Sequence, residues 1–155
     1  MFQQSSRVPR LMMAGVYLAC AHWALAGGFF LTIGSPVAAN APQVKGAVLV
    51  VRPDGCHEPT KAQITGTAEG LVAGARRSIP LKLVALPTPG VYAVFQEWPA
   101  EGVWVVSLTG SYLGATTSAI VPIGPKGFIR ASSKFFPHSA NETEIAALLR
   151  TLETE

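Results

Sequence analysis

The residues in this sequence whose types are best suited to bind a metal ion or to react are three consecutive ones, Cys56, His57 and Glu58. Thiolate and imidazole are ligands that copper and zinc prefer, and a metal site needs about three or four donors that converge on one point. Neighbours along a strand point to opposite faces, so only an irregular backbone would gather these side chains. The flanking letters, PDG before the cysteine and P after the glutamate, favour such an irregular segment.

One further histidine, His138, lies outside the N-terminal forty residues and could complete a site with Cys56 and His57. These three residues form the metal-site hypothesis, with copper or zinc as the ion, whereas the main expectation is that the protein needs no cofactor. All methionines lie within the first 13 residues, so a methionine-rich copper site is excluded from the rest of the chain. The structural alternative makes Cys56 a small apolar residue at the start of a strand and leaves His57 in solvent.

A cysteine nucleophile needs an imidazole within hydrogen-bonding reach of its sulfur and a third group that orients the imidazole. Adjacent residues rarely adopt this arrangement, so only His138 could serve as the base for Cys56. No glycine-rich turn that would form an oxyanion hole lies beside the cysteine, and the sequence contains no phosphate-binding loop. We therefore predict that the protein is not an enzyme.

Aromatic and basic side chains provide a second kind of candidate site. Trp98 lies in the turn EWPAEG, where its ring could stack on a ligand or cover the end of the core. The segment GPKGFIRASSKFFPHS interleaves basic and aromatic residues, a pattern also found in proteins that bind single-stranded nucleic acid. Phe135 and Phe136 of this segment are expected instead to wedge the C-terminal helix against the sheets. Arg76 and Arg77 are expected in a solvated loop.

The N-terminal segment indicates export. Two arginines precede an apolar run at residues 11–33, and no acidic residue precedes residue 40. A positive start, an apolar middle and then small residues are the layout of a secretory signal peptide. Val37 and Ala39 occupy the positions that a signal peptidase reads. We predict a signal peptide at residues 1–39, cleaved after Ala39, and a periplasmic or secreted protein.

The alternative is an uncleaved membrane anchor, because the same apolar run reaches the roughly 20 residues that span a bilayer. The protein would then contact the membrane through this segment alone. Without residues 1–39, ten basic residues stand against nine acidic ones. This balance argues against a nucleic-acid partner, since phosphate binding needs clustered positive charge. Cys56 is then the only cysteine, so an intramolecular disulfide is excluded.

The remainder of the chain has the pattern of an all-β protein. From residue 45 onward, short apolar runs rich in valine, threonine and aromatic residues are separated by turns rich in glycine and proline. Turns at intervals of roughly 8 to 15 residues predict an antiparallel sandwich or barrel. The expected fold is a small immunoglobulin-like antiparallel β-sandwich at residues 40–139, followed by one amphipathic helix at residues 140–155.

Three of these runs carry specific expectations. In SIPLKLVAL, residues 78–86, alternate apolar positions share one face, and Pro80 places the strand at an edge or a bulge. VYAVFQ and VWVVSLTG, residues 91–96 and 103–110, are apolar on both faces. They are predicted to be central strands that pair as a hairpin across the turn between them. Trp104 would then lie in the core between the sheets.

The last segment, NETEIAALLRTLE, has helical periodicity. Asn141 and Glu144 form a capping-box pattern at its start. One helical face carries four apolar residues: Ile145, Leu148, Leu149 and Leu152. This face is expected to dock on the sandwich, because an amphipathic helix gains most from burying its apolar stripe. Alternatively it binds another protein, with Leu148 and Leu152 as the contact residues.

Residues 87–110, PTPGVYAVFQEWPAEGVWVVSLTG, combine a proline-glycine turn, an aromatic strand, an acidic turn and a second aromatic strand. This segment resembles the hairpin of small exported bacterial immunoglobulin-like domains of the YtkA and FixH type. The resemblance implies a compact sandwich outside the cytoplasmic membrane, in proteins often encoded with copper or oxidase assembly systems. The paired histidine and methionine ligands that would support copper handling are missing from this sequence.

Together these features favour a non-catalytic exported β-sandwich that acts through protein-protein contacts in the bacterial envelope. Two alternatives stand beside this expectation. One is a copper- or zinc-handling accessory protein that uses Cys56 and His57. The other is a membrane-anchored form of the same domain.

Overall fold

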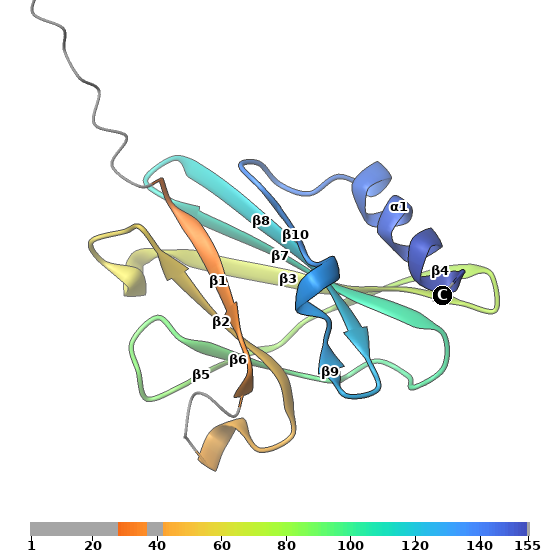
Figure 1. Ribbon diagram of the computed structural model, residues 1–155. Helices are drawn as coiled ribbons and strands as arrows, with labels where there is room; N and C mark the ends of the chain where they lie inside the picture. Colours follow the sequence, from red (N-terminus) through yellow and green to blue (C-terminus); the bar gives the residue numbers. More distant parts are fainter. Residues whose placement is uncertain (1–27, 37–41, 155) are drawn as a thin grey trace, which may run out of the picture.

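The computed structural model describes residues 28–36 and 42–154, which form two antiparallel β-sheets and one α-helix (Figure 1). The first sheet has the strand order β1-β2-β6-β5, with β1 Phe30–Gly34, β2 Ala47–Asp54, β5 Leu83–Ala85 and β6 Tyr92–Phe95. The second sheet has the order β10-β8-β7-β3-β4, and β9 also pairs with β8. Its strands are β3 Gln63–Val72, β4 Ala75–Pro80, β7 Val103–Tyr112, β8 Ala115–Gly124, β9 Gly127–Phe128 and β10 Lys134–Phe136. Short 3-10 helices occupy three connections: η2 Pro42–Val44, η3 Pro59–Lys61 and η4 Arg130–Ser132.

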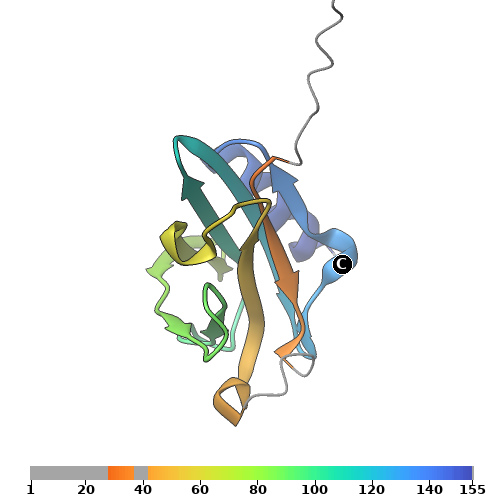
Figure 2. The ribbon, with the colours of Figure 1, turned by 90° about the vertical axis from the view of Figure 1, so that its left-hand side faces the viewer.

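The main hydrophobic core lies between the two sheets (Figures 1 and 2). Leu49 and Val51 of the first sheet and Val106 and Leu108 of the second are all fully buried in it. Residues at alternate positions of both sheets therefore face one another, which is the packing of a β-sandwich. The predicted all-β architecture with a C-terminal helix is confirmed.

β1 is a core strand that lies inside the predicted leader. It pairs with β2 in antiparallel register from Phe30 opposite Asp54 to Gly34 opposite Val50. Its inward side chains, Leu31 and Ile33, are 2% and 4% exposed and belong to the main core. The folded domain thus begins upstream of the predicted start at residue 40. The predicted cleavage point after Ala39 lies outside the described residues, and cleavage there would separate this strand from the domain.

The predicted strand SIPLKLVAL is divided between the two sheets. β4 ends at Pro80 on the edge of the second sheet, and β5 begins at Leu83 on the edge of the first. Proline has no N–H to donate, and the strand ends there; one more backbone hydrogen bond, from Leu81 N–H to Gly66 O at 2.9 Å, holds the chain to β3 before it crosses to the other sheet. The edge position is confirmed. Ile79, Leu81 and Leu83 pack against the main core as the alternation predicts, whereas Ala85 is exposed.

β6 and β7 are central strands as predicted, but the hairpin between them is wrong. β6 lies between β2 and β5, while β7 lies between β3 and β8 in the opposite sheet. Each strand is covered on both faces by a different neighbour. The inner faces meet the main core; the outer face of β6 packs under Leu86, and that of β7 packs under the helix. Apolar residues on both faces of a strand therefore indicate that both faces are buried. They do not identify which strand lies next to it in the sheet.

Trp104 lies in the core between the sheets, as predicted, and is 3% exposed. Its indole N–H donates to the backbone oxygen of Glu101 at 2.8 Å, and its ring centroid lies 6.2 Å from that of Trp98. Gly70, the residue paired with Trp104 on β3, makes room for the ring. A Cβ atom at Gly70 would lie 2.5 Å from the indole carbons, so this approach requires glycine.

Helix α1, Glu142–Glu153, packs on the outer face of the second sheet (Figure 1). Its predicted capping box is present: Glu144 N–H donates to Asn141 Oδ1 at 3.0 Å, and Asn141 N–H donates to the Glu144 carboxylate at 2.8 Å. The apolar helical face is buried against Val105 and Ile120. Within residues 28–36 and 42–154, no helix is long and apolar enough to cross a membrane.

Candidate functional site

The predicted metal-ligand segment lies between β2 and η3. Cys56 is partly buried, whereas His57 and Glu58 are exposed. Glu58 forms an ion pair with Lys61 at 2.8 Å, which engages its carboxylate locally. Among the described residues, no group of three or more histidine, cysteine, aspartate and glutamate side chains is placed to hold a metal ion. The structure therefore does not support the metal-site hypothesis at this segment.

The environment of Cys56 disfavours the thiolate form of its side chain. Burial raises the pKa of the thiol above its ordinary value, and the negative charge of Asp54 raises it further. Both effects disfavour the thiolate, which is the form that binds metal ions and acts as a nucleophile. The local electrostatics thus argue against both chemical roles that the sequence suggests for this residue.

We expect Asp54→Asn to lower the pKa of the Cys56 thiol and to speed its alkylation by less than about tenfold, because a partly exposed charge pair is screened by solvent. The measurement is the rate of carbamidomethylation by mass spectrometry between pH 6 and pH 10. The wild-type rate should reach half its maximum at a higher pH than that of a free cysteine, and the variant at a lower pH than wild type. Glu58→Gln is the control and should leave the profile unchanged.

His138 lies in the segment that joins β10 to α1. Its ring is 5.4 Å from that of Phe136 and 3.6 Å from the Glu144 carboxylate, and its side chain is about half exposed. The backbone oxygen of His138 accepts a hydrogen bond from Ser118 Oγ at 2.6 Å. These contacts anchor the segment before the helix on β8. They do not make His138 part of a group of metal ligands, so the predicted set of Cys56, His57 and His138 is not assembled.

The predicted binding residues Trp98, Leu148 and Leu152 are packed inside the molecule. Trp98 is 5% exposed and its ring packs against Trp104, so little of its surface remains for a ligand. Leu148 is 7% exposed and Leu152 packs beside it over the second sheet. The helix therefore docks on the sandwich as expected, because burial of its apolar stripe against β7 and β8 stabilises the fold more than exposure of the stripe to solvent would.

Arg76, which was expected in a solvated loop, belongs to an ion-pair network with one buried member, Glu69. The structure places Arg76 in β4, because the turn between β3 and β4 is only two residues long. Its guanidinium lies 3.2 Å from the Glu69 carboxylate and 2.9 Å from that of Glu142 in helix α1. Glu69 is 7% exposed and also accepts from Ser78 Oγ at 2.7 Å. This network ties the helix to the sheet and is structural.

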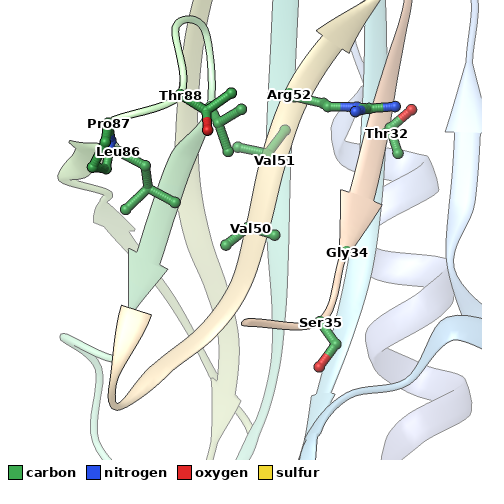
Figure 3. A pocket seen from close by; sticks show the side chains of 10 residues that line it. Thr32, Gly34, Ser35, Val50, Val51, Arg52, Leu86, Pro87 and Thr88 are labelled. Atoms are coloured by element: carbon green, nitrogen blue, oxygen red, sulfur yellow. The ribbon is translucent and has the colours of Figure 1, made fainter. Parts of the chain in front are cut away.

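Two hollows flank β1. We call the first the outer groove, a hollow of about 520 Å³ on the outer face of the first sheet. Gly34 and Val50 form its floor, and Leu86, Pro87 and Thr88 lie on the side opposite β1 (Figure 3). A Cβ atom at Gly34 would lie 3.2 Å from Val50, so the glycine helps to keep this groove open. The groove is mainly apolar, and Arg52 is the charged residue among those that line it.

We call the second hollow the edge groove, a hollow of about 500 Å³ between β1 and β10, the edge strands of the two sheets. It contains two of the large apolar side chains that are most exposed in the described part of the chain: Phe30, 48% exposed, and Phe135, 56% exposed. Its walls also include aromatic and aliphatic side chains from both edges: Phe29, Ile33, Phe136 and Pro137. Exposed aromatic rings in a groove are typical of binding sites.

The edge groove also offers backbone hydrogen-bonding groups. β1 pairs with β2 alone, so its other edge carries no strand. The backbone oxygen of Ile33 accepts from Arg130 Nη2 at 3.2 Å and therefore points to this free edge. In an antiparallel strand the outward groups alternate, so the N–H and C=O of Leu31 also point outward. Arg130 lies beside this edge, with its guanidinium 5.6 Å from the centre of the Phe128 ring.

The sequence contains a signal for this site in the alternation of residues 30–34. FLTIG, residues 30–34, alternates between inward and outward positions with the period of a strand. The alternation is hidden because it continues the apolar run that begins at residue 11. Phe135 was assigned to a wedge under the helix, but it lies opposite Ala119 on the side of β10 that faces β1.

No protein-family model, curated protein or solved structure matches this chain.

Proposed function

We propose that this protein is a non-catalytic exported domain of the bacterial envelope that binds an extended segment of another protein along the free edge of β1. The observation that carries the proposal is the edge groove, where the free edge of β1 meets the exposed rings of Phe30 and Phe135. A segment that adds as a strand gains backbone hydrogen bonds from the edge and side-chain contacts from the groove.

β1 is the edge of the described sheets that carries the least protection against such pairing. Sheet edges in natural proteins are blocked by charged side chains, by proline or by being very short. β4 carries Arg76 and Arg77 and ends at Pro80, β5 has three residues, and β10 has three residues that include Lys134. β1 has five residues, FLTIG, and neither a charge nor a proline of its own; the Arg130 guanidinium meets its edge at the backbone oxygen of Ile33.

The groove also indicates the chemistry of the bound segment. Its walls are aromatic and aliphatic, so the segment would place an apolar side chain between Phe30 and Phe135. Arg130 stands at one end of the free edge and favours a carboxylate there, because guanidinium and carboxylate form strong paired hydrogen bonds. We therefore expect an extended partner segment that carries an apolar residue near an aspartate, a glutamate or a chain terminus.

The immunoglobulin-like type of the sandwich and its relation to the YtkA and FixH domains are part of this proposal. The buried Trp104 between the sheets supports the former. The relation to the YtkA and FixH domains is weakened, because the segments of residues 91–110 do not pair as the predicted hairpin, and that hairpin carried the resemblance. The metal-handling alternative loses ground because Cys56, His57 and His138 are not gathered.

The test is selection of peptides from a phage-displayed library of random dodecamers, followed by isothermal titration calorimetry with the synthetic peptide that binds best. We expect Phe30→Ser and Phe135→Ser to weaken its binding by about tenfold or more each, because each removes an apolar contact worth at least about 1.4 kcal/mol. Leu113→Ser is the matched control. Leu113 is 88% exposed at the tip of the β7–β8 hairpin and does not line the edge groove.

Strand addition makes a second, independent expectation for the same peptide. The outward N–H of Leu31 should exchange with solvent more slowly when the peptide is bound, because it becomes part of a ladder. Amide exchange followed by NMR measures this directly. Peptides that bind with equal affinity to wild type, Phe30→Ser and Phe135→Ser, and that leave the Leu31 amide unchanged, would refute the proposed site.

A further inference from the structure

The structure places the start of the folded domain well before the predicted cleavage point. Phe29 already belongs to the domain, because its ring lies 5.9 Å from that of Tyr112 and against Gly110 on β7. β1 follows at once, with Leu31 and Ile33 buried in the main core. A signal peptidase that cut after Ala39 would therefore leave a whole core strand on the discarded leader.

The sequence just before β1 carries a better site. Ala24 and Ala26, in the tripeptide ALA, place a small residue at each of the two positions that a signal peptidase reads before the scissile bond. The apolar run between Arg10 and Ala24 then covers residues 11–23, a length within the 7–15 residues usual for the apolar core of a signal peptide. The run looked too long for a signal peptide only because the strand at residues 30–34 continues it.

We propose that the leader is removed by hydrolysis of the peptide bond between Ala26 and Gly27. One water molecule is consumed; the leader ends in the Ala26 carboxylate, and the mature chain begins with the amino group of Gly27. Gly28, the residue that follows the proposed new terminus, lies in open space, with no atom within 4 Å of a Cβ built there. This inference rests on the proposed export of the protein and replaces Ala39 as the cleavage point.

The experiment uses the full chain in lipid vesicles with a purified type I signal peptidase, and a well-behaved exported precursor as the activity control. N-terminal sequencing should show a product that begins at Gly27. Ala24→Lys and Ala26→Lys should each slow processing by more than about tenfold, because pockets shaped for a small side chain exclude a large one. Val37→Lys and Ala39→Lys are the matched controls and should be processed as wild type is.

Two results would overturn the inference. A product that begins at Asn40 would support the cleavage predicted after Ala39 and would remain consistent with export. A full-length chain that stays uncut while the control precursor is processed would favour the membrane-anchored alternative. Export itself is measured separately, as the accessibility of the domain to protease added to intact spheroplasts of cells that express the full chain. An accessible but uncut chain refutes the cleavage site alone, whereas an inaccessible chain refutes export.

Discussion

A chain that begins at Asn40 is expected to be largely unfolded under conditions in which a chain that begins at Gly27 is folded. The shorter chain lacks β1, whose Leu31 and Ile33 are almost fully buried. Each such side chain contributes about 1.5 to 3 kcal/mol through burial, and the loss also uncovers Val51 and Leu108 beneath them. The total approaches the 5 to 15 kcal/mol by which a typical domain is stable. Urea unfolding followed by far-ultraviolet circular dichroism measures the difference.

Point substitutions separate the contribution of the core side chains from the effect of truncation. In the chain that begins at Gly27, Leu31→Ala is expected to lower the free energy of unfolding by about 3 kcal/mol, because it leaves a cavity in the core. Phe30→Ala, on the same strand with a half-exposed side chain, should cost less than about 1 kcal/mol. If the chain that begins at Asn40 had the same free energy of unfolding as the chain that begins at Gly27, β1 would not be a core strand.

Replacement of Arg76 by leucine is expected to lower the free energy of unfolding by about 2 to 3 kcal/mol, since it leaves the Glu69 carboxylate buried without its cation. The Arg76 side chain is 33% exposed, which places the value below that of a fully buried pair. The same change frees Glu142 in the first turn of helix α1. The measurement is again urea unfolding at neutral pH.

The neighbouring residue and the partner residue supply the controls. Arg77→Leu should change the free energy of unfolding by less than about 0.5 kcal/mol, because Arg77 is exposed and forms no ion pair in the described part of the chain. Adding Glu69→Leu to Arg76→Leu should restore much of the lost stability, because it removes the unpaired buried charge. If the double variant is no more stable than Arg76→Leu, burial of an unpaired Glu69 is not the cause.

The parts of this fold that could be predicted are those encoded by neighbours in the sequence. The bounds of helix α1 were predicted to within two residues at each end, because its capping box and its apolar spacing are both local. The proline-glycine turn at Pro89-Gly90 is equally local, and Gly90 has the positive φ, 77°, that a type II turn requires. The strands between such turns followed from the spacing of glycine and proline.

The parts that could not be predicted depend on which segments meet in space. Two strands that are apolar on both faces looked like a hairpin, yet β6 and β7 lie in opposite sheets. Arg76 and Glu142 are 66 positions apart, so no local pattern links them. The edge groove combines Phe30 and Phe135, which only the final topology brings to one side of the sandwich. The sequence therefore did not predict that these segments meet in one candidate site, because their proximity depends on the topology of the sheets.

The contact between Trp98 and Trp104 has an optical consequence. Trp23 is the one other tryptophan of the chain, and it lies within the proposed leader, so light that tryptophan absorbs and tyrosine does not would excite this buried pair alone in the processed protein. The two indoles are close enough for their excited states to couple, which gives a near-ultraviolet signal that vanishes when the sheets part. The molecule thus carries a built-in reporter of its own core, and no chromophore has to be attached to follow its assembly.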